Sequence, residues 1–206
     1  MRGSEHLGAI VHGIVLAFGL ILPLGVQNVF VFSQGVTQPK LRKALPAALT
    51  ASLCDTLLIV SAIWGLSAIL FQIEWLRTAV MAAGILFLIY MGFVIWRAEP
   101  AAMETKKAMT SRQQIAFALS VSLLNPHAIL DTVGVIGTSA LKYAGTQQLY
   151  FAAACIAVSW LWFIGLTIAG SMIKRLENSG AVTKILNKCS ALFIWGTGVY
   201  LIFELF

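Results

Sequence analysis

Charged residues are scarce in this sequence. Only 11% of the 206 residues are Asp, Glu, Lys or Arg, whereas 59% are hydrophobic, and the mean hydropathy is +0.88. Soluble domains carry roughly 25% charged residues. The scarcity of charge therefore excludes an ordinary soluble domain and predicts an integral membrane protein.

Cysteine is also rare, with three residues and no CxxC pair. Cys54 and Cys155 fall inside apolar runs, and no cluster of His and Cys accompanies them, which argues against zinc binding or thiol redox chemistry. The motifs HExxH and GxSxG are absent as well, so the sequence offers no metal box or nucleophile of a common hydrolase. We therefore expect neither an enzyme nor a bound cofactor or metal ion.

Long apolar runs, by contrast, fill most of the chain. A helix needs about 20 apolar residues to cross the hydrocarbon core of a bilayer. Six stretches approach or exceed this length: Leu7–Phe32, Pro46–Phe71, Thr78–Ile95, Gln114–Leu141, Leu149–Ser171 and Ile185–Leu205. They predict six transmembrane helices and a single transmembrane domain over residues 1–206.

The basic residues are unevenly distributed between the expected loops. In a soluble protein a net charge of +6 would suggest nucleic-acid binding. Here 11 of the 14 basic residues fall in loops on one side of the membrane: Lys40, Arg42, Lys43, Arg97, Lys106, Lys107, Arg112, Lys174, Arg175, Lys184 and Lys188. Because basic loops stay in the cytoplasm, this pattern predicts both termini outside and no nucleic-acid partner.

Two of the five prolines interrupt apolar runs at matching positions. Pro23, followed by Gly25, lies in the first run, and Pro126 lies in the fourth. Proline removes a backbone donor and disfavours helical angles in the preceding residue, so we expect both helices to be broken there. Each broken helix is the first of three, so the chain divides into two halves of three helices. Because three is an odd number, the second half enters the membrane from the opposite side to the first. The prediction is an all-α fold of two inverted three-helix repeats, about 7–96 and 114–206, joined by a cytoplasmic linker, 97–113.

Two carboxylates lie deep inside the apolar runs, Asp55 in the second and Asp131 in the fourth. Each costs about 2.5–3.5 kcal/mol at the centre of a transmembrane helix, and no Lys or Arg lies deep in any run to neutralise them. The missing positive charge is most simply a transported cation or a proton. Past Pro126, His127 and Asp131 are one α-helical turn apart. A proline kink with a hydrogen-bonded polar pair is the structural alternative for this segment.

Two segments carry a resemblance to a known family. The stretches LPLGVQNVFV at 22–31 and LNPHAILDT at 124–132 resemble the signatures of the LysE/ArgO family of amino-acid exporters. The Asn-Pro-His-x-x-x-Asp form around Asp131 is similar to the lysine/arginine branch, and Asp55 matches an aspartate of the arginine exporters. Val26 departs from the family pattern, which usually has proline after the glycine. The resemblance implies export of L-arginine or L-lysine across a bacterial cytoplasmic membrane by a multi-pass protein.

Energetics then constrain the mechanism of such an exporter. Moving a positive charge outward against the membrane potential costs about 2.3 kcal/mol per 100 mV, so we expect coupling to proton entry by alternating access. Asp131 and Asp55 are expected to bind the substrate cation or the proton. Asn28, Asn125 and Gln27 would hold the α-amino and carboxylate groups, and His127 would either relay protons or hydrogen-bond Asp131. An exporter of another small solute, a neutral amino acid or a metal cation, is the alternative. The oligomeric state stays open.

Overall fold

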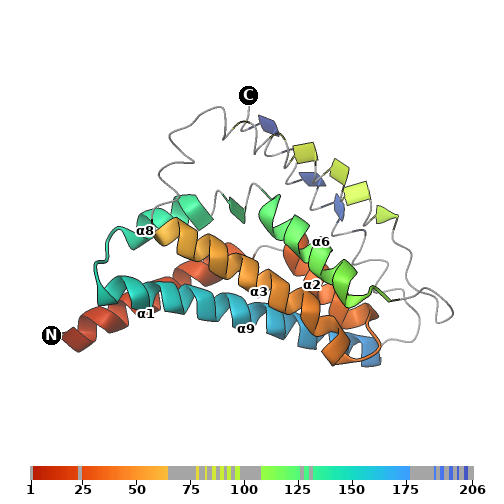
Figure 1. The fold of residues 1–206 in the computed structure, drawn as a ribbon, viewed down its shortest axis with the longest axis horizontal. Helices are drawn as coiled ribbons and strands as arrows, with labels where there is room; N and C mark the ends of the chain where they lie inside the picture. Colours follow the sequence, from red (N-terminus) through yellow and green to blue (C-terminus); the bar gives the residue numbers. More distant parts are fainter. Residues whose placement is uncertain are drawn as a thin grey trace.

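A computed structural model gives the fold (Figure 1). It describes residues 2–22, 25–64, 108–125, 128–129 and 132–176, with isolated positions between 78 and 97 and between 188 and 203. Every regular element in these ranges is helical, as expected: α1 (Arg2–Ile21), α2 (Val26–Thr37), α3 (Leu41–Ile63), α6 (Ser111–Leu123), the π-helix η1 (Thr132–Gly137), α8 (Thr138–Ala140) and α9 (Thr146–Leu176).

Two of these helices can cross a membrane by their own length and composition. They are α3, with 23 residues, and the segment Thr146–Ile173 of α9, with 28. At about 1.5 Å per residue, α3 is about 35 Å long, enough for the hydrocarbon core. The segment His6–Ile21 of α1 and the helix α2 are together long and apolar enough to cross a membrane, and they are bent by 79° where they join. The expected helices over 78–95 and 185–205 fall outside the continuously described residues.

The first apolar run is broken, as its proline predicts. Helix α1 ends at Ile21 and α2 begins at Val26, with Gly25 in an extended conformation before it. Pro23 itself lies outside the described residues. The amide of Asn28 donates a hydrogen bond of 2.7 Å to the carbonyl oxygen of Ile21. This carbonyl is one of the last four of α1, which lack a partner within the helix, so Asn28 satisfies a backbone group that the break frees.

The fourth apolar run also divides into separate helices. A capping box, in which Thr110 and Gln113 bond to each other's backbone N–H, begins α6. The helix ends at Leu123, three residues before Pro126, which lies outside the described residues together with His127 and Asp131. The following π-helix was not expected. Its i→i+5 hydrogen bonds replace α-helical ones across Thr132–Gly137, within the fourth apolar run, where the sequence predicts a transmembrane α-helix.

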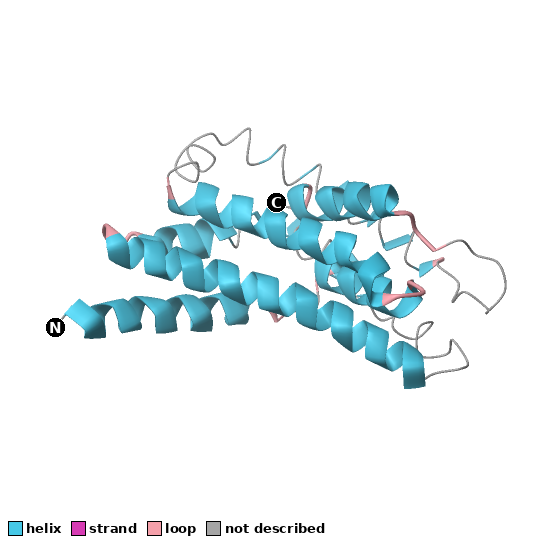
Figure 2. Cartoon of the chain, turned by 60° about the horizontal axis from the view of Figure 1, so that its bottom comes forward, coloured by secondary structure: helices cyan, strands magenta, loops and turns pink. Residues whose placement is uncertain are grey.

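Helix α9 contacts α1, α2 and α3, and their chain directions can be compared with its own (Figures 1 and 2). Both α1 and α2 advance along α9 in the same chain direction, although they are bent relative to each other. The ring of His6 near the start of α1 lies against Tyr150 near the start of α9, while Gly35 near the end of α2 packs on Gly170. Helix α3 runs the opposite way, since its later residue Ile59 clusters with the early part of α9.

The close approach of α2 and α9 depends on two glycines. A Cβ at Gly35 would collide with the carbonyl oxygen of Thr167 and lie 3.1 Å from the Cα of Gly170. A Cβ at Gly170 would collide in turn with the carbonyl oxygen of Phe32. Small residues that let two backbones meet are typical of helix contacts within membranes.

The start of α6 lies beside the start of α3. The side chain of Gln114 in α6 donates a hydrogen bond of 2.9 Å to the carbonyl oxygen of Lys43 in α3. The chain that leaves α3 at Ile63 therefore returns to the end where α3 began before it enters α6 at Ser111. The third helix that the sequence predicts between them stays a prediction.

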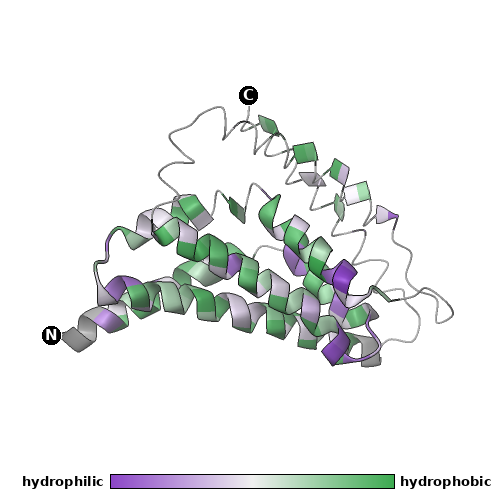
Figure 3. Cartoon of the chain, viewed as in Figure 1, coloured by the Kyte–Doolittle hydropathy of each residue, from purple (hydrophilic) through white to green (hydrophobic). Residues whose placement is uncertain are grey.

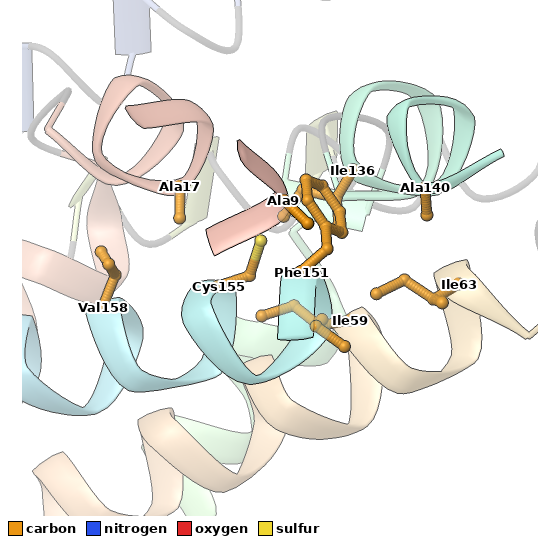
Figure 4. Close-up of a cluster of buried hydrophobic side chains, with 10 residues drawn as sticks. Ala9, Ala17, Ile59, Ile63, Ile136, Ala140, Phe151, Cys155 and Val158 are labelled. Atoms are coloured by element: carbon orange, nitrogen blue, oxygen red, sulfur yellow. The ribbon is translucent and has the colours of Figure 1, made fainter. Parts of the chain in front are cut away.

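Apolar residues occupy both the interior and the outer surface. One core cluster joins α1, α3, α9 and the η1–α8 segment, with Phe151 and Cys155 of α9 completely buried in it (Figure 4). Large apolar side chains also project outward, including Leu57, 62% exposed, and Leu161, 70% exposed. The hydrophobic colour predominates along the helices, and the hydrophilic colour gathers towards their ends (Figure 3). An apolar outer surface of this kind is suited to lipid.

Candidate functional site

The carboxylate of Asp55 joins three helices halfway along α3. The amide of Gln27 in α2 donates a hydrogen bond of 3.1 Å to its Oδ1 atom. The hydroxyl of Ser159 in α9 donates a hydrogen bond of 2.8 Å to its Oδ2 atom. We call Asp55, Gln27 and Ser159 the Asp55 clamp. Gln27 and Ser159 are buried, whereas Asp55 is half-buried.

The Asp55 clamp carries no positive charge. Both hydrogen-bond donors are neutral, and in the described part of the chain no Lys or Arg forms an ion pair with Asp55. Neutral donors stabilise a carboxylate, and hydrogen bonds to an ionised group are roughly twice as strong as neutral ones. They do not cancel its charge, however. A carboxylate in this position therefore favours either a proton or a cationic ligand.

A second group of polar side chains holds the break between α1 and α2. The indole of Trp162 in α9 donates a hydrogen bond of 3.2 Å to the side-chain oxygen of Asn28, whose amide binds the carbonyl of Ile21. The ring of Phe18 in α1 meets that of Trp162 edge to face, with centroids 6.4 Å apart. Trp162 lies one turn after Ser159 on α9. A single face of α9 therefore bonds both to the carboxylate of Asp55 and to Asn28 at the α1–α2 break.

Two further residues of α3 lie beside Asp55. The hydroxyl of Ser52, one turn earlier, is buried with no hydrogen-bond partner. An unsatisfied buried hydroxyl costs free energy, and a polar ligand or a water molecule would satisfy it. Thr56, the residue after Asp55, accepts a hydrogen bond of 3.1 Å from the indole of Trp160 and so adds a neutral link between α3 and α9.

The structure joins two of the site residues that the sequence predicted, Asp55 and Gln27. A third, Asn28, follows Gln27 on α2 but is bonded to Ile21 and Trp162 instead. Asn125 is buried just after α6. The predicted residues Asp131 and His127 lie outside the described residues, so their roles stay predictions. Sequence reasoning did not find Ser159 or the link from Trp162 to Asn28. The sequence did contain a feature that could have indicated them: Ser159 and Trp162 lie close together in the middle of the apolar run of α9.

A second buried polar group lies where α2, α3 and α6 meet. Gln38 donates hydrogen bonds to Gln34 at 3.2 Å and to the carbonyl oxygen of Met109 at 2.9 Å. Gln114 donates to the same Met109 oxygen at 3.1 Å, and Gln34 donates to the Met109 sulfur at 3.5 Å. We call these four residues the glutamine cluster. It contains no charged side chain, and it attaches the end of the expected cytoplasmic linker to three helices.

A lipid-compatible surface, a broken helix and a half-buried carboxylate with no cationic partner among the described residues are together features of a membrane transporter. The chain matches the LysE type translocator family over residues 18–205. It is 55% identical over 206 residues to YisU of Bacillus subtilis (strain 168), a protein named for a proposed role in amino-acid transport. That match covers 100% of this chain and 94% of YisU.

Two arginine exporters are also similar to the chain. The arginine exporter protein ArgO of Pectobacterium carotovorum subsp. carotovorum (strain PC1) is 33% identical over 197 residues, which cover 92% of this chain and 94% of ArgO. ArgO of Salmonella typhi is 34% identical over 188 residues, covering 89% of this chain and 88% of that protein. No solved structure is significantly similar. The chain belongs to the LysE family of translocators, as its two motifs indicated.

Proposed function

We propose that the protein exports basic amino acids, L-arginine or L-lysine, across the bacterial cytoplasmic membrane in exchange for protons. The observation that carries this proposal is the Asp55 clamp. Its carboxylate lies inside a candidate span and is bonded by two neutral donors. A guanidinium or ammonium group would supply the missing positive charge, and the two similar proteins named as arginine exporters support this class of substrate.

The same carboxylate accounts for proton coupling. An aspartate in a low-dielectric site binds either a proton or a cationic side chain, because holding both would leave a net positive charge. Protons that enter from outside would then displace the amino acid outward. Asp131 in the second repeat would also bind the substrate cation or the proton, with His127 beside it and Asn125 at the second break. These three assignments rest on the sequence motif.

The helix directions group the described loops at two ends of the bundle, as the expected topology requires. The α2–α3 connection and the end of the linker, both expected in the cytoplasm, meet in the glutamine cluster. At the opposite end, His12 of α1 and the hydroxyl of Tyr143 before α9 are joined by a hydrogen bond of 2.8 Å. Residues 1–6 and 142–145 are both expected outside. Loops assigned to one side of the membrane thus lie at one end of the bundle.

Counterflow in proteoliposomes tests the proposal. The purified full-length protein is reconstituted into vesicles loaded with unlabelled L-arginine, L-lysine or L-threonine, and uptake of radiolabelled L-arginine is followed. We expect internal arginine and lysine to drive accumulation of the label and threonine to fail. An inward proton gradient should also accelerate net arginine efflux.

Protein-free vesicles provide the control for leakage. Accumulation of labelled threonine with no arginine counterflow would replace the proposal with a neutral amino-acid exporter. If neither label accumulates while the protein is folded and reconstituted, amino-acid export by this chain is refuted.

A further inference from the structure

We propose that the Asp55 clamp is the unloaded state of the transport site, which the amino acid opens by taking the carboxylate from Ser159. This inference rests on the proposed function and specifies how occupancy of the site changes the packing of the helices. Ser159 is then a positioning residue: it holds Asp55 while no amino acid is bound and releases it when the cation arrives.

The contacts of the carboxylate carry the argument. Its two oxygens are bonded from two different helices, Oδ1 by Gln27 of α2 and Oδ2 by Ser159 of α9. A guanidinium group binds a carboxylate with two parallel hydrogen bonds, one to each oxygen, in the plane of the carboxylate. Donors to a carboxylate prefer the same plane. Each carboxylate oxygen has two in-plane lone pairs, so the cation can displace Ser159 from Oδ2 while Gln27 keeps its bond to Oδ1.

Loss of the Ser159 bond would change how α9 is held on α3. Within the described ranges, two hydrogen bonds join the side chains of these helices at this level, Ser159 to Asp55 and Trp160 to Thr56. Ser159 bonds an ionisable group, whereas the Trp160 bond joins two neutral groups. Opening the clamp therefore removes the bond that reaches the carboxyl group of Asp55, whereas the bond between Trp160 and Thr56 can persist. The amino acid would in this way loosen α9, which also holds the α1–α2 break through Trp162.

Two transport modes distinguish the unloaded carrier from the loaded one. In counterflow the carrier crosses with amino acid in both directions, whereas in net efflux it must return without amino acid. Ser159→Ala removes a bond that the unloaded carrier makes. We expect its net L-arginine efflux to fall about tenfold more than its counterflow does. Its Kd for L-arginine should fall about tenfold, the size expected of one hydrogen bond to a charged group.

Trp160→Phe is the matched control. It removes the neutral hydrogen bond between the same two helices and keeps an aromatic ring, and it leaves Asp55 and Ser159 untouched. We expect its ratio of net efflux to counterflow to remain that of wild type. Ser159→Thr keeps the hydroxyl, so it should restore net efflux relative to the alanine variant.

Each contrary outcome has a definite meaning. If net efflux and counterflow of Ser159→Ala fall by the same factor, or if Trp160→Phe gives the same ratio as Ser159→Ala, Ser159 only packs helices and the inference is overturned. An unchanged or higher Kd for L-arginine in Ser159→Ala also overturns it. If the wild-type protein itself shows no arginine counterflow, the proposed function fails and the inference falls with it.

Discussion

The Asp55 clamp and the glutamine cluster, two polar groups among the described helices, are built from different chemistry. The glutamine cluster joins neutral amides to backbone carbonyls and a sulfur atom at one end of the bundle. The Asp55 clamp surrounds a carboxylate with neutral donors in the middle of the bundle. Both connect three elements, and both bury side chains that prefer water.

The difference lies in what each group still needs. The side-chain amides of the glutamine cluster donate within the protein, and although the buried side-chain oxygen of Gln114 has no partner, the cluster holds no net charge that a ligand must cancel. A buried carboxylate with neutral donors keeps a net charge, which only a proton or a cation removes. From this comparison we propose that the glutamine cluster serves stability and the Asp55 clamp serves transport. The following predictions test this division, from the largest expected effect to the smallest.

Removing the charge should have the largest effect. Asp55→Asn preserves size and polarity but removes the partner of the cation, and losing one partner of a desolvated charge pair costs about 2–5 kcal/mol. Arginine export should fall about 30-fold to several-thousandfold, since each tenfold is about 1.4 kcal/mol. Cells without their own exporter, fed arginine-containing dipeptides, would accumulate arginine and stop growing. Asp131→Asn should behave in the same way, and normal clearance by both variants would refute the cation site.

Restoring a continuous helix at the second break should reduce transport by a smaller amount. Pro126→Ala returns a backbone donor to the segment after α6, and a backbone hydrogen bond contributes about 0.5–1.5 kcal/mol. The variant should reach the membrane at the wild-type level but export arginine about tenfold more slowly, which initial rates in proteoliposomes would reveal. Transport at the wild-type rate would show that the break is incidental.

Separating α2 from α9 should weaken the fold itself. A methyl group at Gly35 collides with the carbonyl oxygen of Thr167, and overpacking of this kind costs about 1–3 kcal/mol. Gly35→Ala should therefore lower the midpoint of thermal unfolding in detergent. Gly165→Ala on α9 is the control, because a methyl group there would meet no described atom within 4 Å. Equal midpoints for the two variants would contradict the close contact.

Disrupting the glutamine cluster should affect transport least. Gln114→Leu leaves the carbonyl oxygen of Lys43 without the side-chain donor it has now, which costs about 1–3 kcal/mol of stability. Its thermal midpoint should fall, while the arginine Kd of the folded fraction stays within about twofold of wild type. A Kd raised as much as in Asp55→Asn would remove the distinction between the two polar groups.

Local patterns were enough to predict much of this molecule. The spans over α3 and α9 follow from apolar length, and the break between α1 and α2 follows from one proline. Asp55 was identified because a carboxylate in an apolar run has few structural explanations. The contacts of Asp55 and Asn28 with α9 could not be predicted. Ser159 lies 104 residues from Asp55 and Trp162 lies 134 residues from Asn28 in the sequence, so no local spacing indicates either pair.

The π-helix was missed for a different reason. Its six residues, Thr132–Gly137, contain small and β-branched residues that fit an α-helix equally well, so composition does not distinguish the two. Such widened turns frequently occur at functional sites. This one follows directly after Asp131, whose role still rests on the motif.

Direct binding of L-arginine tests the central claim most simply. Radiolabelled L-arginine is titrated against purified wild-type protein and Asp55→Asn in detergent, and proton release is followed with a pH indicator in weak buffer. The account predicts that binding to the wild type releases protons, and that Asp55→Asn binds at least about 30-fold more weakly. Binding to Asp55→Asn with the wild-type Kd and the wild-type release of protons would contradict it.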